Sequence, residues 1–420
     1  MKKNTPPRSP HNFENGDENE LEPVEIDFGE FEEVIDLDGI AGEDEEEEEM
    51  EEDEGVPDMS RVSFKQHKGS VFICGFTSNG LVATGGEDDF AYVWKANDGS
   101  LLHACTGHKD SVTSLAVSHD SHFLATGDMS GYIQVWKTTD FSKIWEFETG
   151  DLSWLAWHHA SHVLLAGTME GDMWMWLVPQ GNARTFPSYG TASQCGAFLP
   201  DGKRAVAGYD DGSVRVFDLK SGELKCHFSG GLAHSGQVTS ISVHKDNALV
   251  LSGSSDCTAK LFNTVSGKVV GTLNCDAAAG SQEGAVGGVV GDDDDDDDDD
   301  ESVENGVEAV SFCPFISNIA VTTTLSGLVI IWDISTQVIR HTIVQGCGTS
   351  QLVWHPSEPV VFAACLDSVV RAYDARSGDL LKKYTGHRSS IFYMDLSKDG
   401  TALVTASDDG TARVFSLMDS

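Results

Sequence analysis

Short runs of alternating apolar and polar residues, separated by Gly, Asp and Ser, recur through most of the chain. They are clearest after Gly107-His108, where apolar runs occupy residues 112–117, 123–126, 132–136 and 143–148. Alternation over such short lengths, with turn residues in between, is typical of antiparallel strands joined by tight turns. The pattern therefore predicts a unit of four strands.

This unit recurs, and each copy has one apolar run that ends in an aromatic residue. The eight aromatic residues are Trp94, Trp136, Trp176, Phe217, Phe262, Trp332, Tyr373 and Phe415. Their intervals are 42, 40, 41, 45, 70, 41 and 42 residues, so a single interval carries an insertion. A period of about 40–45 residues with strand patterns is typical of propeller blades. The sequence thus predicts an all-β fold, an eight-bladed β-propeller.

The two ends of the repeat region predict how the ring closes. Only five residues follow Phe415, too few for a fourth strand in the last blade. Residues 60–65 form an unpaired strand-like run before the first repeat and can complete that blade, which leaves no open sheet edge. We therefore expect the propeller to span residues 60–420. A seven-bladed ring would leave one repeat without a place.

The net charge of −41 is concentrated in two segments. Residues 1–60 hold 24 acidic residues against Lys2, Lys3 and Arg8, and residues 276–304 hold 13 acidic residues and no basic one. Because they are highly charged and poor in aromatics, residues 1–59 are predicted to be a disordered tail and residues 276–304 a disordered insertion. The charge argues against direct nucleic-acid binding and favours basic partners, or solubility alone.

Composition also bounds the compartment and the chemistry. The nine cysteines form no C-x-x-C pair and several lie in apolar strands, so we expect reduced, buried thiols rather than disulfides or metal ligands. No run of 18 apolar residues and no secretory signal are found, so we expect a cytoplasmic protein, with nuclear access left open. Phosphate-binding, zinc-protease and nucleophile-elbow motifs are absent, so neither an enzyme nor a cofactor is predicted.

Several segments give the chain a specific resemblance. It resembles WD-repeat proteins and, among them, the angio-associated migratory cell protein family. The segments that carry the resemblance are Thr84-Gly85-Gly86-Glu87-Asp88-Asp89, Gly107-His108-Lys109-Asp110-Ser111-Val112-Thr113, Ala125-Thr126-Gly127-Asp128-Met129-Ser130-Gly131, Trp174-Met175-Trp176, Leu199-Pro200-Asp201-Gly202-Lys203-Arg204-Ala205-Val206 and Ser266-Gly267-Lys268-Val269-Val270-Gly271. The resemblance implies either a chaperone that captures the basic N-terminal segment of a large-subunit ribosomal protein, as a fungal relative does, or a role in cell migration and angiogenesis. Animal members are also described as binding heparin, which this acidic N-terminus does not favour.

In the WD-repeat pattern a His, a hydroxyl, an Asp and the aromatic residue form a buried hydrogen-bond network in each blade. The matching residues are His67, Thr84, Asp88 and Trp94 in the first repeat, His234, Ser252, Asp256 and Phe262 in the fifth, and His387, Thr405, Asp409 and Phe415 in the eighth. A catalytic triad has similar members, but it would not recur in every blade. We therefore expect structural networks. The third, sixth and seventh repeats lack the His and must rely more on packing.

One face of the propeller is predicted to bind a partner. The residue before each turn Asp, or its substitute, is Glu87, Met129, Met169, Asp210, Ser255, Leu325, Leu366 or Asp408. Residues early in the first strands should ring the same opening; they are Phe72, Thr113, Ser153, Gln194, Thr239, Glu308, Ser350 and Phe392. Glu87, Asp210, Glu308 and Asp408 are the predicted partners of basic side chains, with Phe72, Phe392 and Trp154 packing against the aliphatic stems. The alternative is that these are ordinary turn and strand-start residues.

An acidic run lies in the insertion between the fifth and sixth repeats, on the same predicted face. It consists of Asp292, Asp293, Asp294, Asp295, Asp296, Asp297, Asp298, Asp299 and Asp300. These charges lie within a Debye length of about 8 Å of one another and should keep the run open. It could raise the capture rate of a basic client, or serve only solubility. Calcium binding would be weak without an EF-hand pattern.

Together these features predict a non-enzymatic binding protein, monomeric, whose client is a basic large-subunit ribosomal protein. The alternative is a scaffold or adaptor in cell migration and angiogenesis signalling. Steep loss of affinity with salt would distinguish the first from the second.

Overall fold

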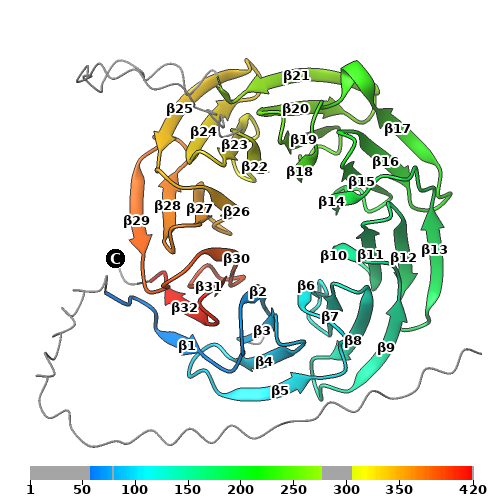
Figure 1. Ribbon diagram of the computed structural model, residues 1–420. Helices are drawn as coiled ribbons and strands as arrows, with labels where there is room; N and C mark the ends of the chain where they lie inside the picture. The colour runs from blue at the N-terminus through cyan, green and yellow to red at the C-terminus, as the bar shows by residue number, and fades with distance from the viewer. Residues whose placement is uncertain (1–56, 78–79, 277–304, 419–420) are drawn as a thin grey trace, which may run out of the picture. The chain divides into compact units, whose positions relative to one another are not determined.

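A computed structural model describes residues 57–77, 80–276 and 305–418 and shows a ring of eight four-stranded antiparallel sheets around a central channel (Figure 1). The predicted eight-bladed all-β propeller is confirmed. Of the predicted tail (1–59) and the predicted insertion (276–304), only residues 57–59 and 276 lie within the described residues. No helix in the part that the structure describes could cross a membrane.

The strands follow one another from the channel outward in every blade. Blade one holds β2 (Val71–Phe76), β3 (Leu81–Gly86), β4 (Ala91–Lys95) and β5 (Leu101–Cys105), and blade two β6 (Val112–Val117), β7 (Phe123–Asp128), β8 (Tyr132–Lys137) and β9 (Lys143–Glu148). Blade three holds β10 (Leu152–Trp157), β11 (Val163–Thr168), β12 (Met173–Leu177) and β13 (Asn182–Phe186), and blade four β14 (Ser193–Phe198), β15 (Arg204–Tyr209), β16 (Val214–Asp218) and β17 (Leu224–Phe228). A short 3-10 turn, η1 (Gly230–Leu232), follows.

The second half of the ring repeats the plan. Blade five holds β18 (Val238–Val243), β19 (Leu249–Ser254), β20 (Thr258–Asn263) and β21 (Lys268–Asn274), and blade six β22 (Val307–Phe312), β23 (Ile319–Thr324), β24 (Leu328–Asp333) and β25 (Val338–Val344). Blade seven holds β26 (Thr349–Trp354), β27 (Val360–Cys365), β28 (Val370–Asp374) and β29 (Leu380–Tyr384), and blade eight β30 (Ile391–Leu396), β31 (Ala402–Ser407), β32 (Ala412–Ser416) and β1 (Val62–Phe64).

Closure follows the prediction. β1 pairs antiparallel with β32, with Val62 opposite Val414 and Phe64 opposite Ala412. The N–H of Met59 also donates to the carbonyl of Thr385 at 2.9 Å, so ordered contacts begin before residue 60, three residues into the predicted tail. Because the first and last segments share one sheet, blade eight has four strands like the others and the ring is closed.

The core consists of apolar clusters between neighbouring blades rather than one centre. One such cluster joins Val93 of β4 to Leu124 of β7, and another joins Phe64 to Trp94 and Val404 across the closing blade. Middle strands are therefore covered on both faces, as in β23, where every residue is buried, whereas the outermost β13 is exposed along most of its length. This explains why middle strands are apolar runs and outer strands are not.

Second strands extend further than the apolar runs indicate. β7 continues to Asp128, two residues past the predicted end at 126. Gly127 is paired with Ile133 in the ladder. The position requires glycine because a side chain there would collide with Leu152 of the next blade. The small residues of this segment thus serve close packing between blades and are not turn residues.

Candidate docking face

The predicted hydrogen-bond networks are present and buried. His67 lies between Asp88 and Thr84, at 2.9 Å from each, and the indole N–H of Trp94 donates to the same hydroxyl at 3.4 Å. In blade five His234 Nε2 lies 2.6 Å from Ser252 and its Nδ1 3.0 Å from Asp256.

Blade eight has the same arrangement. His387 lies 2.7 Å from Thr405 and 2.9 Å from Asp409. Asp409 also accepts the backbone N–H of Arg388 at 3.0 Å, so the network fastens the loop before the first strand to the turn after the second. Thr84, Ser252 and Thr405 are 0% exposed, so no substrate could reach their hydroxyls. The networks are structural.

Blade two has a fourth network that the sequence analysis did not list. His108 lies 3.1 Å from Asp128 and 2.8 Å from Thr126, to which Trp136 donates at 3.2 Å. The signal was available, since Gly107-His108 and the hydroxyl and Asp stand at the same spacing as in the first repeat.

The eight turn residues hold equivalent places. In each blade the backbone N–H of this residue donates to the carbonyl of the residue that precedes the first strand. The pairs are Glu87–Ser70, Met129–Ser111, Met169–Asp151, Asp210–Ala192, Ser255–Gln237, Leu325–Gly306, Leu366–Gly348 and Asp408–Ser390. The eight side chains therefore leave the blades at the same strand ends. All but Ser255 are exposed.

The first-strand residues share a second feature, a β-bulge. In every blade the ladder between first and second strand slips by one residue, and the residue skipped is the predicted ring residue. These are Phe72, Thr113, Ser153, Gln194, Thr239, Glu308, Ser350 and Phe392. A bulged residue is released from pairing and its side chain is re-aimed. All eight are half-buried, which suits a surface that lines an opening.

Four of the predicted contact residues gather where blade eight meets blade one. The rings of Phe72 and Phe392 lie 5.8 Å apart. Asp408 accepts hydrogen bonds from the Ser70 and Ser389 hydroxyls at 2.7 and 2.8 Å, and Glu87 accepts the backbone N–H of Ser70 at 3.0 Å. We call Phe72, Glu87, Phe392 and Asp408 the acidic–aromatic cluster.

Glu308 lies in blade six, in a recess of about 290 Å³ lined by residues of β18, β22 and β26. Burial raises the pKa of its carboxyl. No ion pair is found for Glu308 among residues 57–77, 80–276 and 305–418. A half-buried carboxylate without a cation is poised to accept one from a partner.

The other predicted contacts are elsewhere. Asp210 is exposed in the blade four turn, away from the acidic–aromatic cluster. Trp154 is half-buried between blades three and four, where its N–H donates to the Ser193 hydroxyl at 3.0 Å and its ring lies against Gly196. The structure thus brings four of the seven predicted contact residues together, and Trp154, Asp210 and Glu308 lie in other blades. Asp292–Asp300 lie outside the described residues.

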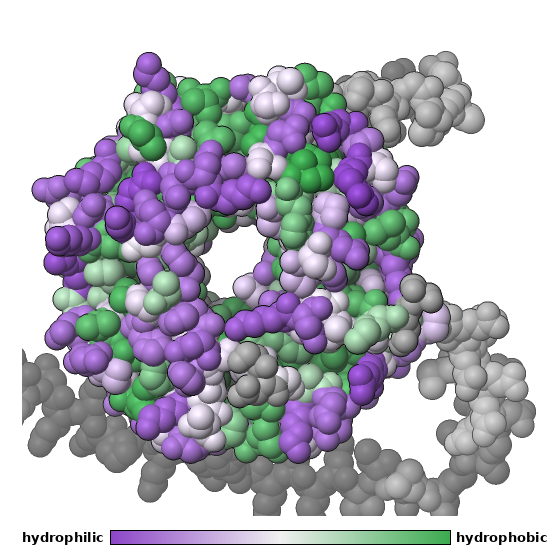
Figure 2. Space-filling view, turned by 180° about the vertical axis from the view of Figure 1, so that it is seen from behind, coloured by the Kyte–Doolittle hydropathy of each residue, from purple (hydrophilic) through white to green (hydrophobic). Residues whose placement is uncertain are grey.

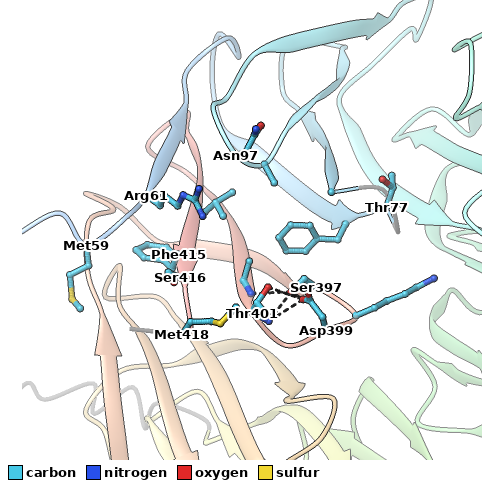
Figure 3. A pocket seen from close by; sticks show the side chains of 16 residues that line it. Met59, Arg61, Thr77, Asn97, Ser397, Asp399, Thr401, Phe415, Ser416 and Met418 are labelled. Carbon is cyan, nitrogen blue, oxygen red and sulfur yellow. Dashed lines mark hydrogen bonds between the residues drawn. The ribbon is translucent and has the colours of Figure 1, made fainter. Parts of the chain in front are cut away.

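The channel itself is open. Viewed from behind, its opening is rimmed largely by hydrophilic residues (Figure 2). A cavity of about 740 Å³ lies elsewhere, between blades eight and one at the opposite strand ends from Glu87 (Figure 3). There the Asp399 carboxylate accepts hydrogen bonds from the Ser397 and Thr401 hydroxyls, so this carboxylate already has partners within its own turn.

Comparison with known proteins agrees with this geometry. The model of the WD domain, G-beta repeat, matches residues 99–137, 184–218, 223–263 and 378–416. The chain is 23% identical to the ribosome assembly protein SQT1 of Saccharomyces cerevisiae, over 90% of this chain and 93% of that protein. A crystal structure of Chaetomium thermophilum Sqt1 bound to the N-terminus of the ribosomal protein L10 has a TM-score of 0.73 at 21% identity, covering 86% of this chain and all of that one.

The human angio-associated migratory cell protein is 41% identical over 429 residues, covering 98% of this chain and 96% of the human one. Identity of this extent spans every blade. The chain therefore belongs to the angio-associated migratory cell protein family, within the WD-repeat propellers.

Proposed function

We propose that this protein is a binding protein that holds a basic segment of a large-subunit ribosomal protein before its assembly. The proposal is supported by two relatives, a ribosome assembly protein and a propeller bound to a ribosomal protein N-terminus. Its nine cysteines are all free, which suits a reducing compartment such as the cytoplasm.

One observation carries the proposal. Glu87, Asp210, Glu308 and Asp408 are all placed by turns or bulges at the same strand ends. None of the four pairs with a Lys or Arg among the residues that the structure describes. Carboxylates that lie at the same strand ends and have no Lys or Arg partner of their own attract a basic peptide and then pair with it.

We infer different roles for the aromatic pair, for Glu308 and for the exposed acids. The paired rings of Phe72 and Phe392 offer a flat apolar surface beside two carboxylates, which suits the aliphatic stem and charged head of Lys or Arg. Glu308 in its recess would be the most desolvated contact, and contacts of that kind contribute most to affinity. The exposed acids at the rim mainly raise the association rate.

The test is a charge reversal of the acidic–aromatic cluster. We expect Glu87→Lys combined with Asp408→Lys to weaken binding of a synthetic L10 N-terminal peptide by at least 100-fold in calorimetry. The matched control is Glu358→Lys with Asp379→Lys, which makes the same charge change at exposed residues of the opposite strand ends. Equal binding by the two double variants would refute the placement.

The eight turn residues also suit a second candidate function, that of a scaffold in cell migration. Between the acids stand four exposed apolar residues, Met129, Met169, Leu325 and Leu366, with 39–49% of their surface exposed. These suit an apolar partner. Affinity for the basic peptide should fall steeply with salt, whereas an apolar scaffold contact should change little.

A further inference from the structure

Two turns from neighbouring blades bring three histidines close to one carboxylate. The turn between β6 and β7 supplies His119, Asp120 and His122, and the turn between β10 and β11 supplies His162. Asp120 Oδ2 lies 2.8 Å from Nε2 of His162 and 2.8 Å from Nδ1 of His122. One ligand atom each of His119, Asp120 and His162 lies within 4.8 Å of the other two.

The carboxylate of this cluster is held in place. Asp120 Oδ1 accepts the hydroxyl of Ser118 at 2.7 Å and the backbone N–H of His122 at 3.2 Å, which leaves Oδ2 directed at the imidazoles. Burial would raise the pKa of Asp120, but these donors and His162 hold it below its ordinary value.

The imidazole that comes from the second turn is held as well. The His162 ring packs edge-on against Phe123, with centroids 4.6 Å apart. Lys398 of blade eight donates to the backbone carbonyl of His119 at 3.3 Å and so fastens the first turn from its other side. Ordered supports of this kind are what orient metal ligands.

We propose that His119, Asp120, His162 and His122 bind one Zn²⁺ ion between blades two and three. Zinc takes imidazole nitrogens at about 2.0–2.1 Å and carboxylate oxygens at about 2.0–2.2 Å in a tetrahedron, so its ligand atoms lie about 3.3 Å apart. The two 2.8 Å contacts open by about half an ångström to admit the ion. His122, with 65% of its side chain exposed, is free to rotate into the fourth position.

The ligand set selects the class of metal. Imidazole suits Zn²⁺ and neighbouring transition metals, whereas Ca²⁺ and Mg²⁺ require an all-oxygen set. The sequence analysis predicted no metal site because it considered cysteine spacings and the Asp run, and this cluster joins turns about 40 residues apart.

The site lies in turns that follow the first strands, at the strand ends opposite the acidic–aromatic cluster. It is therefore independent of the proposed function. Bound zinc would join blade two, which has a complete network, to blade three, which has none. Because zinc binds the folded chain, it would raise the stability of the whole ring by mass action.

The test uses the full chain after chelator treatment, titrated with ZnCl₂ in a calorimeter and with CoCl₂ in a spectrophotometer. We expect one site with the visible bands of tetrahedral cobalt, and a rise in Tm with zinc. His162→Gln and the exposed His119→Gln should each weaken this site at least tenfold and remove the rise in Tm. His159→Gln, an exposed histidine of the same blade three turn, should change neither.

The cobalt spectrum separates this site from the acidic segments, whose carboxylates, with His11 as their one imidazole, give octahedral cobalt. Two results would overturn the proposal. One is an octahedral spectrum in the unsubstituted chain, and the other is equal zinc binding by the His119→Gln and His159→Gln variants. Both variants change exposed side chains, so their folding can be verified by circular dichroism without metal.

Discussion

Blade one and blade three have the same four-stranded geometry but are stabilised in different ways. In blade one His67 joins Asp88 to Thr84, and the N–H of Trp94 is directed at the same hydroxyl. Blade three has Ala166 in place of the hydroxyl, and the N–H of the buried Trp176 has no hydrogen-bond partner in the part of the chain that the structure describes.

Blade three compensates with aromatic packing. Trp145, Phe147 and Trp174 surround Trp176 with ring centroids at 5.6, 5.1 and 5.8 Å. Such ring pairs contribute beyond the area they bury. The comparison teaches that strand pairing and packing between blades set the shape of a blade. The polar network is an added stabilisation that fastens its loop to its turn.

The largest effect is expected when the histidine of blade one is removed, which tests whether the network distinguishes the two blades. His67→Ala should lower the free energy of unfolding by about 3 kcal/mol, because it leaves Asp88 and the Thr84 hydroxyl buried without their partner. Urea denaturation followed by tryptophan fluorescence measures the change.

The control lies four residues before the first strand of blade three, the position equivalent to His67. Glu148 stands there, exposed and paired with the exposed Lys109. Exposed pairs contribute little, so Glu148→Ala should cost less than about 0.5 kcal/mol. Similar costs for the two substitutions would mean that the network does not distinguish the blades.

The fold was predictable because its signals are local and repeated. Alternating runs and aromatic ends mark strands within each repeat, and residues 60–65 had no partner except the last blade. The positions of the turn and bulge residues were predictable for the same reason, whereas their role in docking stays a prediction. The position of Trp154 was not predictable, since the bulge at Ser153 re-aims the neighbouring side chains and close contact with Gly196 is a property of two blades.

A second way to sharpen the comparison is pH. Burial lowers the pKa of His387 despite its bond to Asp409. A depressed folded-state pKa means that stability is complete above the unfolded value of about 6.5 and is lost as pH falls through the folded pKa. Asp409 adds a loss at lower pH. Burial would raise its pKa, but His387, Thr411 and the Arg388 N–H hold it below its ordinary value, so its stabilisation is lost below about 3.9.

His387→Gln should therefore flatten the decline in unfolding free energy between pH 7 and 5, by on the order of 1.4 kcal/mol for each unit of the shift. Blade three also has a buried imidazole, His158, whose pKa burial lowers, but it is bonded to no turn Asp or second-strand hydroxyl. His159→Gln in the exposed turn of that blade should leave the slope that His387 contributes as it is. Denaturation curves at several pH values measure both. If the two variants follow the same pH profile, the buried imidazole is not the source of the slope.

The smallest expected effect concerns a single indole N–H. In blade six Trp332 donates to Thr322 at 2.9 Å, whereas Trp176 of blade three donates to nothing among the described residues. Both indoles are buried, so Trp→Phe removes a similar volume from each blade. Trp332→Phe also removes the indole donor of the Thr322 hydroxyl and leaves it only the weak contact with the Cys275 thiol at 3.6 Å. It should therefore cost about 1 kcal/mol more than Trp176→Phe, which removes an unsatisfied group. Paired denaturation curves of the two variants measure this difference. A larger loss for Trp176→Phe would show that aromatic packing in blade three outweighs the hydrogen bond that blade six retains.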